Sequence, residues 1–465
     1  MTTAVVVGSG PNGLTAAVVL ARAGVDVTVL EAEPTVGGGT RSAELTVPGL
    51  VHDICSAVHP MGVASPIFEE LALHEHGLRW AWPEIDAVHP LDGGDAGVLH
   101  RDLDATAAGL GPDGDRWRST FAPHAARAGA LVPELLGPIA HVPRHPFALA
   151  RFGLPALMPA TVLARRWSGD PARALFAGLA AHAVRPLGAP VTGGIGLMFG
   201  TTAHSRGWPV AIGGSQSIAD ALAGAFLAAG GRIETGTRVT TLPDADLVLL
   251  DTAPDQAVTL LGDRLPARTR KAFARWEHGP ASFKIDLAVE GGVPWTAEAA
   301  RRAGTVHVGG RLEEVDAAER AVAAGRMPDR PFVLLTQQYL ADPARSVGDV
   351  HPVWAYAHVP HGYTGDATEA IVRQIERFAP GTRERIVATA VRTPADLYAE
   401  NANYVGGDIS GGALTPRQLV FRPQVAPDPY RLTRGVYLCS SSTPPGGGVH
   451  GMAGYHAATR ALRSL

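Results

Sequence analysis

The sequence predicts an α/β fold in which a Rossmann-type domain is interleaved with a second, α+β domain. Three stretches of the chain carry this prediction. Residues 4–31 have the pattern of one β-α-β unit, residues 204–254 return to alternating helices and strands, and residues 435–462 combine an apolar strand, a glycine turn and a closing helix. Strands that alternate with helices are typical of sheets covered by helices.

The N-terminal unit follows from its apolar periodicity. Residues 4–7 predict a short strand, and a glycine turn leads into a helix that carries Leu14 and Val18 on one apolar face. Gly24 is expected to end this helix, because glycine tolerates the left-handed conformation found there. A second strand over residues 27–30 closes at Glu31.

The remaining segments are assigned to domains by their composition and by the secondary structure expected of them. Residues 282–290 alternate with period two, as in a half-buried strand, and short strands are also expected at 232–235, 239–242 and 247–251. The nucleotide domain is expected to comprise segments 1–70, 204–280 and 400–465, and the substrate domain a helical segment 71–203 and a sheet segment 281–399.

Composition excludes several classes of protein. The 465 residues carry a net charge of -4 with both signs interspersed, so no nucleic-acid partner is predicted. The two cysteines, Cys55 and Cys439, are far apart, which excludes a disulfide framework and favours a reducing compartment. No signal peptide or spanning helix is recognised, so a cytoplasmic protein is expected. The histidines form no metal-binding motif, and no metal site is predicted.

The strongest motif is the glycine turn that begins at Gly8. Gly8 allows a tight turn, Gly10 lets the backbone approach a pyrophosphate, and Gly13 lets helix and strand pack closely. The amides that open the helix would face the phosphates with the helix dipole behind them. Glu31, 18 residues past Gly13 at the end of the next strand, can accept ribose hydroxyls. This arrangement predicts a dinucleotide site.

A second glycine loop, at residues 36–42, follows Glu31 and is bare enough for backbone to lie against a long cofactor. No second glycine turn of this kind follows a strand, since the glycines at 194–200 have the wrong spacing. One dinucleotide domain argues against a reductase with separate FAD and nicotinamide domains.

These motifs together resemble the phytoene-desaturase-like flavoproteins, within the wider flavin amine oxidase and glutathione-reductase fold group. The resemblance covers nearly the whole chain and includes Trp208-Pro209, Gly213-Gly214, the run from Asp251 to Pro254, and the C-terminal run from Tyr437 to Gly454. It implies FAD as the cofactor, with Glu31 at the adenosine ribose, Arg41 near the pyrophosphate, Val239 at the adenine and residues 447–452 beside the flavin ring. The cofactor contacts predicted on this basis are Gly8, Gly10, Pro11, Asn12, Gly13, Glu31, Ala32, Gly38, Gly39, Thr40, Arg41, Val239, Thr252, Ala253, Ser441, Gly448, Val449, His450 and Met452.

The chain departs from this family at residues 440–445. Carotenoid desaturases usually have Gly-x-x-Thr-His-Pro there, whereas this chain has Ser-Ser-Ser-Thr-Pro-Pro. The difference leaves the flavin prediction intact but puts a carotenoid substrate in doubt.

Lys284 and His450 are the candidate catalytic residues. Lys284 lies on a predicted strand and resembles the lysine that reaches the flavin through a water in flavin amine oxidases, while the alternative is a lysine that points to solvent. A buried lysine can have a lowered pKa and serve in proton transfer or oxygen activation. His450 would lie close to the flavin ring, with a surface histidine as the alternative.

Three functions remain open at this point. The first is an FAD-dependent dehydrogenase or desaturase that removes hydride from a largely apolar, lipophilic small molecule. The second is an amine-oxidase-like enzyme that passes electrons to oxygen, and the third is a non-redox flavoprotein such as an isomerase or a regulatory binding protein. The helical insert at 120–203 is expected to form an apolar pocket, and the alternative is that its proline-broken apolar segments lie on a membrane surface. The oligomeric state does not follow from the sequence.

Overall fold

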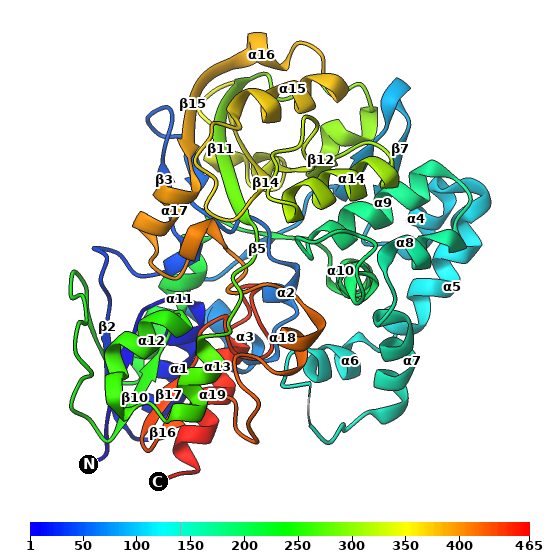
Figure 1. The fold of residues 1–465 in the computed structure, drawn as a ribbon. Coiled ribbons are helices and arrows are strands. Elements are labelled where there is room, and N and C mark those ends of the chain that lie inside the picture. Colours follow the sequence, from blue (N-terminus) through cyan, green and yellow to red (C-terminus); the bar gives the residue numbers. More distant parts are fainter. Residues whose placement is uncertain (140) are drawn as a thin grey trace.

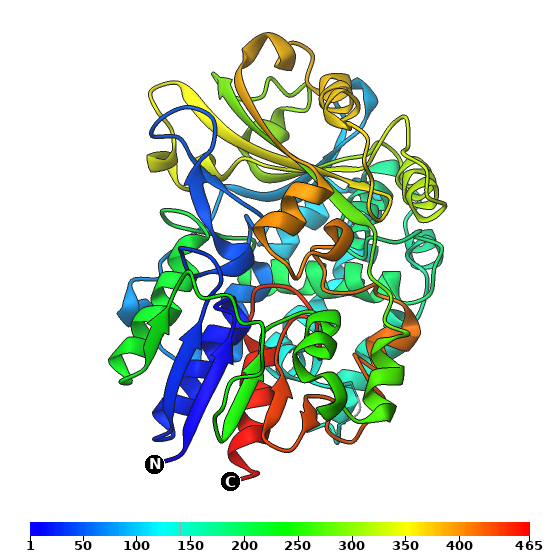
Figure 2. The ribbon, with the colours of Figure 1, turned by 60° about the vertical axis from the view of Figure 1, so that its left-hand side comes forward.

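The computed structural model describes residues 1–139 and 141–465, and its elements form two large sheets with helices on their faces (Figure 1), besides two two-stranded sheets. Both termini lie at the end of the molecule that holds the six-stranded sheet, and the seven-stranded sheet lies at the opposite end (Figures 1 and 2). A predominantly helical region extends to one side in Figure 1.

The six-stranded sheet is the Rossmann-type sheet that the sequence predicts. Its order is β16-β17-β10-β1-β2-β9, and all neighbours are parallel except the β16–β17 pair. The strands are β1 (Thr3–Val7), β2 (Asp26–Leu30), β9 (Arg232–Glu234), β10 (Leu247–Leu250), β16 (Arg431–Thr433) and β17 (Val436–Leu438). The strand expected at 239–242 is wrong, because the chain there makes no ladder and instead runs beside a cavity.

Helices cover both faces of this sheet. One face is covered by α1 (Pro11–Arg22), α11 (Gln216–Ala228) and α19 (Met452–Leu462), which share one buried apolar cluster with the strands. The other face is covered by α12 (Pro254–Leu261) and α13 (Ala267–Phe273). The closest approach is between α1 and α19, where a Cβ at Gly454 would overlap the carbonyl oxygen of Asn12.

The seven-stranded sheet has the order β15-β11-β14-β13-β12-β6-β7 and is antiparallel except for the β12–β6 pair. Its strands are β6 (Ile85–Pro90), β7 (Ala96–Leu99), β11 (Ala281–Glu290), β12 (Ala303–Val308), β13 (Val333–Thr336), β14 (Val350–Val359) and β15 (Ile386–Arg392). The segment 71–203, expected to be helical, therefore also supplies two strands. The pairing of β6 with distant β12 leaves little local signal in the sequence, and β7 pairs only with β6.

The helices of the substrate domain also lie on both faces of their sheet. Helix α15 (Thr368–Phe378) covers one face. The opposite face meets α9 (Asp170–Ala181), α10 (Thr192–Arg206) and α14 (Leu312–Ala323). Beyond these lie α4 (Leu103–Gly109), α5 (Gly114–Ala125), α6 (Ala128–Leu135), α7 (Pro146–Ala156) and α8 (Ala160–Leu163). Figure 1 places α6 and α7 at the periphery of the molecule.

No single helix in the described part of the chain is long and apolar enough to cross a membrane. Only α7 taken together with residues 160–166 meets the criteria of length and composition, and these two pieces are bent by 95°.

Candidate functional site

A cavity of about 920 Å³ connects the two domains. At one end its wall is formed by the glycine turn and by Glu31 and Val239, and at the other by α7, α10 and two aromatic residues of β14. Ligand sites of α/β folds commonly lie outside the carboxyl ends of parallel strands, and the first of these walls occupies that position.

Most of the predicted cofactor contacts line this cavity. They are Gly8, Gly10, Pro11, Asn12, Glu31, Ala32, Gly38, Gly39, Thr40, Arg41, Val239, Thr252, Ser441, Gly448, Val449 and His450. Gly13, Ala253 and Met452 lie outside the lining and support it through their backbone. The amide of Gly13 donates to Asp251, that of Ala253 to Asn403, and that of Met452 to the His450 ring.

The glycine turn is held by Asp251, which the sequence prediction did not include among the site residues. The amide of Gly13 donates to Oδ2 of Asp251 at 3.0 Å, and Gly8 adopts a φ of +97° that favours glycine. Burial raises the pKa of Asp251 to about 7, and the nearby Glu31 carboxylate adds to the rise. Asp251 directly follows β10 and lines the cavity.

Glu31 is fixed in place before any ligand binds. Its carboxylate accepts hydrogen bonds from the amide and the hydroxyl of Ser9, and from the amide of Glu33 at 2.9 Å. A carboxylate offers about four lone-pair sites, so it can still accept a hydroxyl from the cavity. This geometry fits the predicted role at a ribose.

The second glycine loop is held by Arg41. Its guanidinium donates to the carbonyl oxygens of Gly38 at 3.0 Å and Glu400 at 2.6 Å, and thereby ties the loop to the segment that enters the domain near residue 400. A Cβ at Gly38 would lie 3.1 Å from the Cα of Gly10, so the two glycine loops are in close contact. Arg41 also lines the cavity.

At the nucleotide end of the cavity wall, two buried polar atoms have no partner among the described residues. They are Oδ1 of Asn12 and Oγ1 of Thr252. Buried polar atoms are normally hydrogen-bonded, so these two atoms suit a polar ligand at the nucleotide end. Together with the glycine loops and Glu31, they fit the phosphate and ribose portions of a dinucleotide.

The C-terminal segment brings His450 to the cavity wall. Nδ1 of His450 accepts from the amide of Met452 at 3.1 Å, and Ser65 donates to its carbonyl oxygen at 2.6 Å. Burial lowers the pKa of His450 to about 4, so the ring is neutral near pH 7. The surface-histidine alternative is wrong, and the ring fixes the turn that begins α19.

Lys284 is also buried, which excludes the solvent-facing alternative. Its ammonium bonds to the carboxylate of Asp286, two residues farther along β11, and lies 5.7 Å from the ring centre of Trp354. Trp354 lines the cavity, whereas Lys284 is absent from the described lining. The predicted contact between Lys284 and a flavin therefore stays a prediction.

β11 is buried on both faces rather than one. Phe283 and Ile285 face one apolar core. Lys284 and Asp286, which alternate with them along the strand, belong to a buried charged cluster. In that cluster, Arg392 lies 3.4 Å and His52 3.5 Å from the Asp286 carboxylate. The period-two pattern was correct, but its interpretation as a half-buried strand was wrong, because charged partners replace water.

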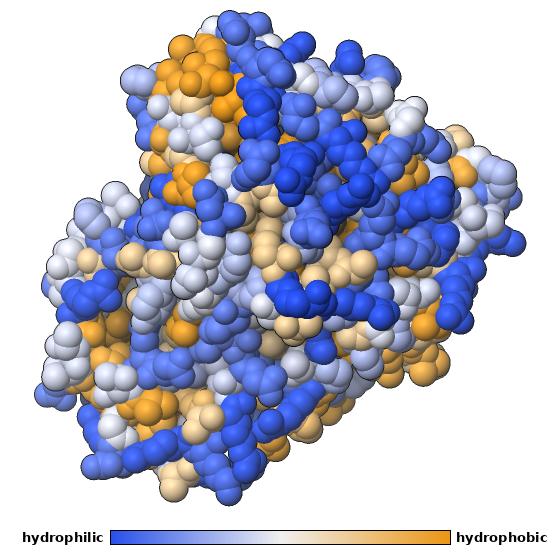
Figure 3. Space-filling view, turned by 45° about the horizontal axis from the view of Figure 1, so that its top comes forward, coloured by the Kyte–Doolittle hydropathy of each residue, from blue (hydrophilic) through white to orange (hydrophobic). Residues whose placement is uncertain are grey.

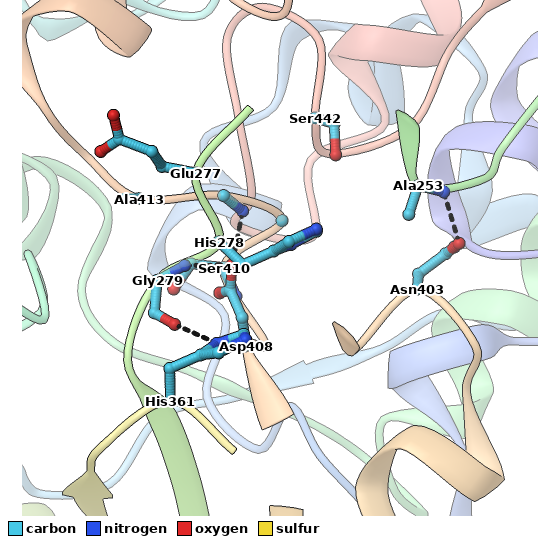
Figure 4. Close-up of polar contacts among 12 residues, drawn as sticks. Ala253, Glu277, His278, Gly279, His361, Asn403, Asp408, Ser410, Ala413 and Ser442 are labelled. Carbon is cyan, nitrogen blue, oxygen red and sulfur yellow. Dashed lines mark hydrogen bonds and ion pairs between the residues drawn. The ribbon is translucent and has the colours of Figure 1, made fainter. Parts of the chain in front are cut away.

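The segment from Asn401 to Leu414 forms a further part of the cavity wall that sequence reasoning missed. Asn403 accepts from the amide of Ala253 at 2.7 Å, and Asp408 accepts from the amides of Gly279, Ser410 and Gly412 (Figure 4). His278 lies between Asp408 and Asp255. Although burial opposes it, the two carboxylates raise the pKa of His278 to about 9.

The far end of the cavity is an apolar chamber. Its lining residues on α7 and α10 are Leu149, Phe152, Gly153, Ala156, Gly194, Ile195, Met198 and Phe199, and Leu334, Trp354 and Tyr356 come from the sheet. His182 supplies a polar atom, and its Nε2 lies 3.1 Å from Nε2 of His307. No local motif marks these residues in the sequence.

No group of three or more His, Cys, Asp or Glu side chains in the described part of the chain could hold a metal ion.

The comparisons with known proteins agree with this geometry. Residues 6–72 match the family model of the NAD(P)-binding Rossmann-like domain. Over 99% of the chain and 93% of the relative, the sequence is 26% identical to the pyridine nucleotide-disulfide oxidoreductase domain-containing protein 2 of Mus musculus.

Two solved structures share the fold over nearly the whole chain. An oxidoreductase from Methanosarcina mazei is 16% identical with a TM-score of 0.65, covering 99% of this chain and 100% of that one. A putrescine oxidase variant is 20% identical with a TM-score of 0.64, covering 100% of this chain and 99% of the other. None of these proteins is described as a phytoene desaturase, so the resemblance to phytoene-desaturase-like flavoproteins stays a prediction. The chain has a Rossmann-type α/β fold that it shares with these oxidoreductases, in agreement with the predicted fold class and enzyme type.

Proposed function

We propose that the protein is an FAD-dependent oxidoreductase that removes hydride from a largely apolar small molecule, as a dehydrogenase or desaturase does. One observation carries this proposal: a single cavity runs from the Gly8–Glu31 nucleotide site to the apolar chamber between α7, α10 and β14. A cofactor that reaches both ends must be long, and FAD has the required dinucleotide and ring portions.

The residues at the nucleotide end have distinct binding roles. Glu31 holds ribose hydroxyls, the amides that open α1 face the pyrophosphate, and the orphaned oxygen atoms of Asn12 and Thr252 take polar groups of the cofactor. At the other end, the N-terminus of α19 supplies a positive dipole beside the segment 448–450. When bound, FAD supplies the hydride acceptor.

The chamber favours an apolar substrate over a cationic amine. Glu134, an acid that lines the cavity beside α7, is already bonded to the His141 ring and to the amides of Arg144 and His145. Glu400, another acid of the lining, is bonded to Arg392. No described carboxylate of the chamber is left to balance an ammonium, and the apolar side chains exclude water from the bond that breaks.

The amine-oxidase-like alternative rests on Lys284, which is buried next to cavity-lining Trp354. It predicts that the enzyme releases peroxide and that Lys284→Met slows reoxidation of the reduced flavin. Unchanged reoxidation in this variant would remove the proposed role of the lysine.

The test is an anaerobic titration of the purified protein, followed by flavin absorbance, with polyenes, acyl compounds and amines as substrates. Bleaching by an apolar compound supports the proposal, and bleaching by amines alone supports the oxidase alternative. Flavin that no substrate reduces would support a non-redox flavoprotein. A colourless protein that cannot be reconstituted with FAD would overturn all three.

A further inference from the structure

Residues 139–157, which contribute to the chamber wall, expose a group of large apolar side chains, and two of these, Ile139 and Leu157, also line the cavity. Ile139, Val142, Phe147, Leu154 and Leu157 are 56%, 91%, 85%, 75% and 62% exposed. They fall within 19 residues, whereas the next such group, Val420, Phe421 and Val425, has three members that are 42%, 44% and 51% exposed. The face seen in Figure 3 is mostly hydrophilic, with separate hydrophobic groups. Contiguous exposed apolar surface marks an interaction site more often than chance exposure does.

Apart from Arg151, helix α7 is apolar on both of its sides. Phe147 and Leu154 are seven residues apart and therefore share one face, which points outward. The opposite face carries Leu149, Phe152 and Ala156, which line the cavity. A helix that is apolar all round is expected inside a protein core or in contact with lipid. Since only Phe152 of α7 is buried, the core explanation fails for the outer face.

The charge of this segment is one-sided. Between Glu134 and Asp170 the chain has four arginines and no acidic residue, although the whole protein has a net charge of -4. Arg144 and Arg151 are exposed, and neither side chain forms an ion pair with any residue that the structure describes. Arg151 lies on the outer face between Phe147 and Leu154. Apolar anchors interspersed with free arginines match the surface of an anionic bilayer.

We propose that the docking face, made of Ile139, Val142, Phe147, Leu154 and Leu157 with Arg144 and Arg151, binds the surface of an anionic phospholipid membrane. The 11 residues of α7 span about 16 Å, too short for the roughly 30 Å hydrocarbon core. The bend of 95° between α7 and residues 160–166 also prevents these two pieces from forming one straight span. The helix therefore lies in the interface, with Phe147 and Leu154 among the acyl chains.

This docking places the bilayer directly against the chamber, because the inner face of the same helix forms the chamber wall. An apolar substrate dissolved in the membrane would then reach the cavity past α7 without crossing water. This step rests on the proposed function, whereas membrane binding itself rests only on the docking face.

The experiment is flotation of the purified full-length protein with vesicles, without substrate. One set of vesicles is phosphatidylcholine, and the other is an equimolar mixture of phosphatidylcholine and phosphatidylglycerol. Wild type is expected to bind the mixed vesicles several-fold more strongly, and high salt should remove that preference. Phe147→Ser/Leu154→Ser should weaken binding to both by about tenfold. Arg144→Gln/Arg151→Gln should lose only the preference for phosphatidylglycerol.

Matched controls remove similar groups elsewhere on the surface. Val387→Ser/Val391→Ser removes two exposed apolar side chains of β15, and Arg264→Gln/Arg326→Gln removes two exposed arginines. Both should bind vesicles like wild type. Thermal unfolding and flavin content of each variant report folding and the proposed function separately from membrane binding.

Three results would overturn the proposal. Wild type could remain unbound with both kinds of vesicle, or it could bind both equally. The third is that Phe147→Ser/Leu154→Ser converts a dimer to a monomer in light scattering, which would assign the face to a second copy of the chain.

Discussion

Lys284 and Asp286 bond to each other across one pleat of β11, and both are fully enclosed by the protein. Burial lowers the pKa of Lys284, and the attraction of Asp286 opposes this effect. Arg392 and His52 also approach the same carboxylate. The lysine therefore belongs to a buried charged cluster behind the cavity wall, whatever it contributes to chemistry.

We expect Lys284→Met to lower the free energy of unfolding by about 3 kcal/mol, because it removes the closest partner of a buried carboxylate. Lys284→Met/Asp286→Leu should recover most of this loss, since it removes both charges. Denaturant unfolding of the two variants gives the comparison. A single variant as stable as wild type would show that the bond does not form in solution.

The contact between α1 and α19 gives a second prediction. A Cβ at Gly454 would overlap the backbone of Asn12, so Gly454→Ala must push the two helices apart. We expect a loss of about 2 kcal/mol or more in stability and weaker cofactor retention, because α1 opens at the nucleotide site. The control is Gly224→Ala in α11, where the nearest atom would be 3.7 Å away. This control should be as stable as wild type or slightly more stable.

Buried histidines predict how stability depends on pH. Burial lowers the pKa of His59, His89 and His450 to about 4, and that of His182 to about 3. Between pH 6.5 and about 4 the unfolded chain binds protons at these positions that the folded chain does not. Stability is therefore expected to fall as the pH drops through this window, by up to roughly 3 kcal/mol for each histidine.

His89→Gln isolates one of these groups. Its ring bonds to the carbonyl oxygen of Gly310 at 2.7 Å, and a glutamine amide can make the same donation. The variant should show a shallower loss of unfolding free energy between pH 6.5 and 4, measured in denaturant at several pH values. His74→Gln, at an exposed histidine, should keep the wild-type slope. Equal slopes in all three proteins would contradict the prediction.

The parts of the site that could be predicted from the sequence depend on local chemistry. The turn at Gly8 needs glycine for its φ of +97°, and Glu31 must follow a strand to reach the same edge. Both requirements leave a pattern in neighbouring residues. Asp251, by contrast, acts across 238 positions in the chain on Gly13, and its bond leaves no local pattern.

The chamber could not be predicted for the same reason. His182, which follows α9, and Trp354 of β14 line the same cavity, and ordinary apolar spacing is all that each segment shows in the sequence. The pairing of β6 with β12 likewise joins residues more than 200 positions apart. The period-two pattern around Lys284 identified a strand, yet it could not distinguish water from buried charged partners.

The last prediction concerns the cofactor. Glu31 accepts two hydrogen bonds from Ser9 and one from the amide of Glu33, so its carboxylate is oriented toward the cavity in advance. Glu31→Ala removes the acceptor for the ribose hydroxyls and leaves the Ser9 hydroxyl without its partner. We expect purified Glu31→Ala to retain at least about tenfold less flavin than wild type, since a hydrogen bond to a charged group contributes roughly 1.5–3 kcal/mol. Flavin absorbance per protein measures the retention, and Glu33→Ala serves as the matched control because it keeps the backbone amide that binds Glu31. Equal flavin content in Glu31→Ala and wild type would show that Glu31 does not bind the cofactor, and would contradict a nucleotide site at the glycine turn.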